Sequence, residues 1–362
     1  MKIFHCDHCG QLLFFENSRC INCGRVLAYL PGIRKIASLE LLSDGEWRSP
    51  LAEAAGRKYR LCQNYANDIV CNWAVRADDP EPFCLSCRTT TLIPDLTIAG
   101  HKRAWIELEM AKRRLFYSLM GLGLPITNRT EDPQYGLAFR FLANVTADEP
   151  PVMTGHDDGV ITINLAEADS AQRESLRLAL GESYRTVLGH FRHEIGHYYW
   201  DRLIAGSAYI NEFRVLFGDE RQDYAEALKQ HYAHGVATSE TTQGCHDPNF
   251  VSAYASSHPW EDWAETWAHY LHMIDALETA RACGLTLAPA RNDEPSLTGE
   301  QSAQPGAADV EDMVSDWIAL TYVLNNLNRS LGLSDPYPFV LSDTVIAKLA
   351  FVGKVVAASG RN

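Results

Sequence analysis

The chain has 362 residues, of which 46% are apolar, and a formal net charge of −14. This length and composition are typical of a globular protein with one sizeable catalytic domain and a smaller module. The first residues, MKIFHCDHCG, lack the apolar core of a secretory signal, and no run of about 18 apolar residues predicts a membrane span. We therefore expect a cytoplasmic protein with no membrane partner.

The charge is distributed unevenly along the chain. Residues 1–100 carry eleven basic and eleven acidic side chains, residues 101–122 carry five and two, and the remainder carries 16 and 33. The acidic charge of the residues after 122 disfavours non-specific binding to nucleic acid or anionic lipid. The pattern therefore argues against a nucleic-acid partner, although the basic segment 101–122 keeps that alternative open.

Eight of the ten cysteines precede residue 88, and the first four are Cys6, Cys9, Cys20 and Cys23. They form two C-x-x-C pairs, each followed by glycine, with the spacing of a zinc ribbon. In a reducing compartment such thiolates bind zinc rather than form disulfides. We predict a structural zinc that supplies the folding free energy of this short segment. The alternative, a redox dithiol, would need a βαβ context that is missing here.

A second structural zinc is predicted from four further cysteines: Cys62, Cys71, Cys84 and Cys87. Only Cys84 and Cys87 form a C-x-x-C pair, whereas eight residues separate Cys62 from Cys71. Four buried free thiols are therefore the alternative interpretation. Residues 25–61 would link the two lobes, and residues 1–100 would form one zinc-ribbon or rubredoxin-like module. Cys245 and Cys283 have no nearby partner and are expected to be ordinary small apolar residues.

The segment 101–122 has apolar residues at helical spacing and is expected to connect the module to a main domain at 123–362. Short strands are predicted at 139–144 and 160–165 because of their β-branched and aromatic content. Helices are predicted at 170–180, 182–204, 211–234, 261–277, 310–331 and 344–357. Strands followed by helices favour an α+β fold. Segment 288–309 has no aromatic residue, Val or Ile, and we expect a flexible loop there.

One of these predicted helices carries the motif H-E-x-x-H, at His193, Glu194 and His197. Residues four apart share one helix face, so the two imidazoles can hold one zinc at roughly 2.0 to 2.1 Å. Zinc lowers the pKa of a bound water toward about 7, and Glu194 is placed to take the proton. A solvated helix face with two histidines is the alternative interpretation.

A catalytic zinc needs a third protein ligand, so we searched downstream for one. Trp200 and Leu203 stand where the metzincin motif requires glycine and histidine, which excludes that class. The segment HPWEDWAETWAHYLH instead places Glu261 and Glu265 four residues apart on one face of a second helix. Spacing alone leaves the two carboxylates interchangeable as the third ligand.

These motifs resemble those of the gluzincin metallopeptidases. Together with the cysteine pairs and the segments HEIGHYYW, DYAEAL and SAYASSHPWEDWAETWAHYLH, they resemble bacterial zinc-binding metallopeptidases that carry an N-terminal zinc ribbon. The resemblance implies a zincin-like domain and assigns Glu261 as the third ligand and Glu265 as the group that orients a histidine ligand. It also implies that Tyr254 faces the reacting carbonyl. His258, between Tyr254 and Glu261, is a candidate substrate contact.

The sequence thus predicts a zinc metallopeptidase with one catalytic and two structural zinc ions and a protein or peptide substrate. Two alternatives stay open: a zinc-ribbon adaptor with an idle protease fold, and a specialised amidase or deconjugating enzyme. The zinc-ribbon module could recognise a protein partner. Zincin clefts commonly present an edge strand to an extended substrate, and strand 160–165 is either that edge or an internal strand.

Overall fold

The computed structural model describes residues 1–144, 152–180, 182, 184–238, 247–291, 293–298 and 310–360. These residues form two compact units. One comprises Lys2–Tyr117 and Thr127–Asp169, and the other comprises Met1, Ser118–Ile126 and Ser170–Asn362. The first unit is called the ribbon unit below and the second the helical unit. Segment 127–169 therefore packs with the cysteine-bearing residues, beyond the boundary predicted near residue 122.

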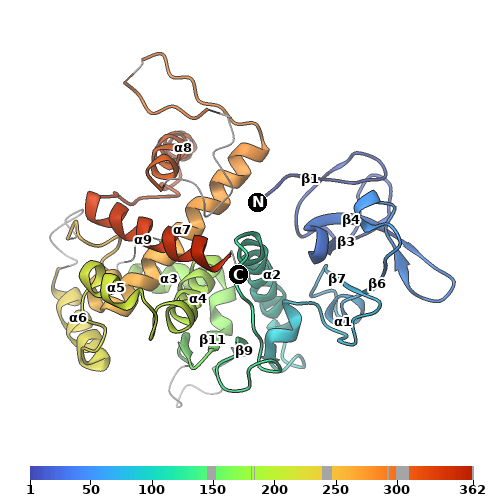
Figure 1. The fold of residues 1–362 in the computed structure, drawn as a ribbon, viewed down its shortest axis with the longest axis horizontal. Helices are drawn as coiled ribbons and strands as arrows, with labels where there is room; N and C mark the ends of the chain where they lie inside the picture. Colours follow the sequence, from blue (N-terminus) through green and yellow to red (C-terminus); the bar gives the residue numbers. More distant parts are fainter. Residues whose placement is uncertain are drawn as a thin grey trace. The chain divides into compact units, whose positions relative to one another are not determined.

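The ribbon unit contains three sheets, all shown in Figure 1. The first pairs β1 with β2, and the second is an antiparallel meander in the order β3-β4-β5-β6-β7. The segment predicted as a linker, residues 25–61, thus contains four of the five strands of this sheet. The strands are β1 (Phe4–His5), β2 (Leu12–Leu13), β3 (Val26–Leu30), β4 (Lys35–Leu41), β5 (Trp47–Arg48), β6 (Lys58–Leu61) and β7 (Ala74–Arg76).

The third sheet has the order β10-β11-β9-β8 and mixes parallel and antiparallel pairs. Its strands are β8 (Thr90–Leu92), β9 (Ala138–Leu142), β10 (Gly155–Asp157) and β11 (Val160–Asn164). The two strands predicted from β-branched and aromatic content are confirmed as β9 and β11. Because β11 pairs on both sides, it is an internal strand, and the interpretation of segment 160–165 as a substrate-binding edge is wrong.

Two helices belong to the ribbon unit wholly or in part: α1 (Gln63–Ala66) and α2 (His101–Gly121), the latter as far as Tyr117. The predicted helix 101–122 is confirmed as α2. Its Tyr117 ring joins an aromatic core, 5.4 Å from Phe15, while Tyr29 and Trp73 lie 4.7 Å apart in the same cluster. Such aromatic clusters contribute much of the buried apolar area that a small sheet module has available.

The helical unit is built around α7, which passes between α4, α8 and α9 (Figure 1). The helices are α3 (Ser170–Leu180), α4 (Val187–Leu203), α5 (Ile210–Phe217), α6 (Tyr224–Thr238), α7 (Pro259–Ala282), α8 (Val310–Ser330) and α9 (Asp343–Ser359). Most predicted helices are confirmed within a few residues. None of the helices in the described ranges is long and apolar enough to span a membrane.

Two predicted helix boundaries are wrong. The predicted helix 211–234 is two helices, because Gly218 ends α5 at a φ of 102°, a conformation that only glycine adopts without strain. The predicted helix 182–204 corresponds to α4, which starts at Val187 rather than at residue 182, because Thr186 caps its first turn. Within the predicted loop 288–309, Leu297 is buried and forms a β-bridge with Leu287, which precedes the loop. Residues 292 and 299–309 lie outside the described residues.

The first turn of α7 is tied to α9 by a buried ion pair. The Nζ of Lys348 lies 2.6 Å from Oδ2 of Asp262, and the two side chains are 3% and 0% exposed. The same Nζ donates to the carbonyl oxygen of Asn249 at 2.7 Å and lies 4.5 Å from the ring centre of Phe250. Asp262 follows Glu261 directly, so this pair fixes the turn that carries the candidate third ligand.

Replacing Lys348 with methionine should destabilise the helical unit by about 3–5 kcal/mol, because the Asp262 carboxylate would stay buried without its partner. Lys354→Met is the matched control, since Lys354 pairs with Glu212 at the surface, where an ion pair contributes about 1 kcal/mol or less. Chemical denaturation of both variants measures the difference. Equal denaturation midpoints for the two would contradict a structural role for the buried pair.

Candidate metal centre

Helix α4 places two imidazoles on one face. It begins after Thr186, whose Oγ1 accepts a hydrogen bond from the backbone N–H of Gly189 at 3.0 Å. His193 and His197 then lie one turn apart, with their Nε2 atoms 3.2 Å from each other. The helix is anchored through Arg192, whose guanidinium lies 2.5 Å from the carboxylate of Asp275 on α7.

Helix α7 reaches the same place because Gly196 lets the two helices approach closely. A Cβ atom at Gly196 would lie 3.0 Å from Cα of Ala264, which leaves no room for a larger residue. The indole N–H of Trp263 donates to the carbonyl oxygen of Gly196 at 2.8 Å, and the rings of Trp267 and Tyr199 stack 5.1 Å apart. The glycine within HEIGH is therefore a packing residue.

This packing brings Glu261 to the two histidines. One carboxylate oxygen lies 2.9 Å from Nε2 of His193, and the other lies 3.5 Å from Nε2 of His197. Ligands at 2.0 to 2.1 Å around a tetrahedral zinc would be separated by roughly 3.3 Å. The two Nε2 atoms and the carboxylate oxygens of Glu261 thus lie close to the separations expected around one zinc ion, and the residues fit the metal.

Charges within this triad reinforce one another. Burial alone would raise the pKa of Glu261, but the two histidines hold it well below its usual range. Burial alone would lower the pKa of His193, but the hydrogen bonds to Glu261 and Glu265 raise it well above its usual range. The carboxylate is therefore ionised at neutral pH, as a metal ligand must be.

A second set of groups orients the ligands. Oε1 of Glu265 lies 2.8 Å from Nδ1 of His193, and Oε2 of Glu265 accepts a hydrogen bond from the hydroxyl of Ser252 at 2.7 Å. The Tyr224 hydroxyl donates to Glu261 at 2.7 Å. Sequence reasoning missed Tyr224 and Ser252, although Tyr224 lies in the motif DYAEAL, which already pointed to the family. Such partners fix the tautomer and the direction of a ligand.

Glu194 lies beside the triad without belonging to it. Its side chain is buried, and its Oε2 atom has no hydrogen-bond partner among the described residues. Burial raises the pKa of its carboxyl above the usual range. The ring of Tyr254 lies 5.8 Å from that of His193, and burial raises the pKa of its hydroxyl, so this group stays protonated. Both groups interact electrostatically with Glu261, and Glu194 also with the two histidines.

His258 occupies a different place from the one predicted. It is the N-cap of α7, and its Nδ1 accepts a hydrogen bond from the backbone N–H of Trp260 at 3.1 Å. Its Nε2 lies 3.3 Å from the carbonyl oxygen of Gln222, and the side chain is 3% exposed. Both ring nitrogens are thus engaged within the protein, and burial lowers the pKa of the ring. The structure gives His258 a capping role.

The first four cysteines converge in the ribbon unit. The sulfur atoms of Cys6 and Cys23 lie 3.7 Å apart, and those of Cys9 and Cys20 lie 3.6 Å apart. Disulfide sulfurs would lie about 2.05 Å apart. Sulfurs bound to one tetrahedral zinc at about 2.3 Å are separated by roughly 3.8 Å. The distances therefore fit a zinc ribbon.

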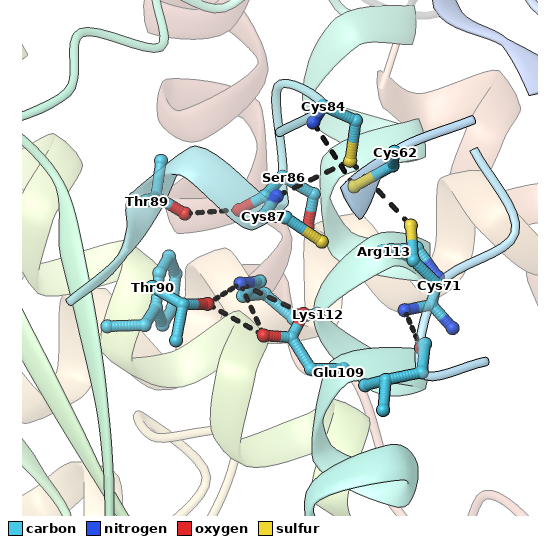
Figure 2. A network of polar contacts seen from close by, with 12 residues as sticks. Cys62, Cys71, Cys84, Ser86, Cys87, Thr89, Thr90, Glu109, Lys112 and Arg113 are labelled. Atoms are coloured by element: carbon cyan, nitrogen blue, oxygen red, sulfur yellow. Dashed lines mark hydrogen bonds and ion pairs between the residues drawn. The ribbon is translucent and has the colours of Figure 1, made fainter. Parts of the chain in front are cut away.

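The second four cysteines also converge, and all of them are buried (Figure 2). The sulfurs of Cys71 and Cys84 lie 3.7 Å apart, and the thiol of Cys62 accepts a hydrogen bond from the backbone N–H of Cys84 at 3.3 Å. Arg113 of α2 is buried beside them and donates to the carbonyl oxygen of Val70 at 2.7 Å. Its charge offsets that of the thiolates, so the alternative of four unrelated buried thiols is disfavoured.

The two remaining cysteines were expected to be small apolar residues. Cys283 follows the last turn of α7 and is exposed, so it is not part of a core. Cys245 lies outside the described residues. Among the described residues, the three clusters above are the groups of cysteine, histidine and acidic side chains that could hold a metal ion.

Comparisons with known proteins show the family to which this chain belongs. A model of the family described as "Putative zinc-binding metallo-peptidase" matches residues 101–355. The chain belongs to this metallopeptidase family. A zinc-ribbon domain model matches residues 3–98 of the same metallopeptidase, which confirms the predicted resemblance and the α+β fold class with its N-terminal ribbon.

Relatives of this metallopeptidase occur in mycobacteria. Uncharacterized proteins of Mycobacterium bovis and Mycobacterium tuberculosis are 44% identical to it over 357 residues, which covers 98% of this chain and 95% of theirs. No solved structure matches the chain significantly. The family thus supports a zinc-binding peptidase.

We expect the purified metallopeptidase to hold about three zinc ions per chain, one at each cluster. Cys87→Ser should lose one ion, whereas Cys283→Ser, at an exposed position, should lose none. A mild chelator should remove the ion of the histidine site first, because that site has fewer protein ligands and no thiolate. Elemental analysis measures each stoichiometry. One ion per chain would rule out both four-cysteine assignments.

The two downstream glutamates should differ in their effect on zinc. Glu261→Ala should lose the zinc of the histidine site, because it removes a ligand. Glu265→Ala and Tyr224→Phe should weaken zinc binding by roughly 10- to 100-fold, because they remove groups that only orient ligands. Zinc titration with a competing chelator measures the three affinities. A zinc-replete Glu261→Ala beside a zinc-free Glu265→Ala would show that the two roles are exchanged.

Proposed function

We propose that the protein is a gluzincin-type zinc metallopeptidase that hydrolyses peptide bonds in protein or peptide substrates. In this proposal His193, His197 and Glu261 hold the catalytic zinc, and the two four-cysteine clusters hold structural zinc ions. The observation that supports it most is the convergence of these three side chains from two helices at tetrahedral distances. The alternative, two histidines on a solvent-exposed helix face, does not account for the buried carboxylate of Glu261 beside them.

Glu194 acts as the general base in this proposal. When bound, zinc polarises the substrate carbonyl and lowers the pKa of the attacking water. Glu194 then accepts the proton of that water and transfers it to the leaving nitrogen. Its burial and its unpartnered oxygen support this role, because a carboxyl group whose pKa is raised by burial is suited both to accepting and to releasing a proton.

Two further groups complete the proposed site. Tyr254 has a protonated hydroxyl near the triad and would donate a hydrogen bond to the carbonyl oxygen as negative charge develops there. Glu265 would hold the tautomer of His193 in which Nε2 is free to bind metal, because Nδ1 carries the proton shared between them. A deconjugating amidase would use the same residues, so substrate identity separates these two possibilities.

Glu194→Gln should retain its zinc and lose turnover by roughly 10²- to 10⁴-fold, because it removes the base without changing a ligand. Glu212→Gln, an exposed position on α5, is the matched control and should behave as wild type. The three zinc-loaded proteins are incubated with a cell lysate, and new peptide termini are compared by mass spectrometry. If wild type and Glu194→Gln produce the same termini, the protein is an adaptor with an idle protease fold.

A further inference from the structure

The ribbon unit contains a cavity of about 460 Å³ that none of the sites above uses. This volume falls within the range of small-ligand pockets, roughly 300–1,000 Å³. Cys87 contributes to its wall, so the second four-cysteine cluster supports it directly. Thr90 also lines it and belongs to the network in Figure 2, in which its hydroxyl contacts Glu109 at 2.7 Å. The cavity is therefore built on the most buried polar part of the unit.

The charged groups at this cavity favour a cation. Glu81 and Glu131 both line it and are exposed. The carboxylate of Glu81 makes no hydrogen bond or ion pair with the described residues, and Glu131 accepts one hydrogen bond, from the backbone N–H of Asn128 at 2.9 Å. Arg88 also lines the cavity, but its guanidinium is neutralised by Asp79 at 2.9 Å. Two carboxylates therefore lack a cationic partner.

The remaining lining residues fit an alkyl chain. Phe83 and Ile93 supply apolar surface, and Ile93 is exposed. Trp105 also lines the cavity but is 1% exposed, and its indole N–H is buried. The cavity thus combines an apolar wall with an acidic rim.

We propose that this cavity binds a lysine or arginine side chain of a peptide, so that the ribbon unit selects basic segments of protein substrates. The alkyl part of such a side chain would pack on Phe83 and Ile93, and its charged end would face Glu81 and Glu131. That these segments are substrates rests on the proposed peptidase function; the binding itself does not.

Binding is tested with the zinc-loaded Glu194→Gln protein, in which the peptide is not cleaved. A blocked pentapeptide with a central arginine among alanines is titrated by calorimetry, and compared with the same peptide carrying glutamine or glutamate. The arginine peptide should bind at least about tenfold more tightly than the glutamine peptide, because a charge-assisted contact is lost in the latter. The glutamate peptide should bind most weakly.

The double variant Glu81→Gln/Glu131→Gln should abolish the preference for arginine. Glu131→Gln keeps an oxygen that can accept from Asn128, so the fold is preserved. The control Glu53→Gln/Asp157→Asn changes the net charge equally at exposed positions outside the cavity and should keep the preference. Equal binding of the three peptides, or a preference that survives in the cavity variant, would overturn the proposal. Inactivity of the wild type would overturn the peptidase function and leave this binding result intact.

Discussion

The close approach of α4 and α7 at Gly196 is the constraint on which the metal centre depends. The ligands come from helices far apart in sequence, and their distances are set by how near the two backbones lie. Any side chain at Gly196 would push Ala264 away and would separate Glu261 from the histidines. The buried pair between Lys348 and Asp262 fixes the same helix from its other side. The site is thus held by helix packing rather than by loops, which gives a metal site its precision.

Much of this arrangement could be predicted from the sequence, because short spacings encode local geometry. In the motif around His193 two histidine ligands lie within about one helical turn. In each C-x-x-C pair two cysteine ligands lie within one short loop. Contacts between distant segments leave no such local signal. The hydrogen bond from Tyr224 to Glu261 joins α6 to α7, and the sheet within residues 25–61 forms only when its strands pair. The break at Gly218 was missed because helical periodicity continues across it.

The two cysteine clusters differ in what surrounds them. In the first, Cys9 and Cys23 are partly exposed, and Asp7 between the first two cysteines accepts hydrogen bonds from Ser38 of β4. In the second, all four cysteines are buried beside Arg113, and the buried pair Lys112 and Glu109 lies close by on the same helix. A zinc ion there would hold α2 against the sheets through charge as well as through packing. The second cluster therefore supports a surface of the ribbon unit that includes the cavity, whereas the first is attached to the five-stranded sheet.

Glu194 is the carboxylate at the candidate metal centre whose buried oxygen has neither a hydrogen-bond nor an ion-pair partner among the described residues. An unpartnered buried oxygen is unfavourable, and most buried polar groups in proteins avoid this state. Glu265 is bonded through both oxygens, to His193 and to Ser252. Glu261 accepts a hydrogen bond from Tyr224 through one oxygen, and its other oxygen lies 2.9 Å from Nε2 of His193. The open oxygen of Glu194 has no such contact, which is what its proposed role as general base requires, because a base must keep one oxygen free to accept a proton.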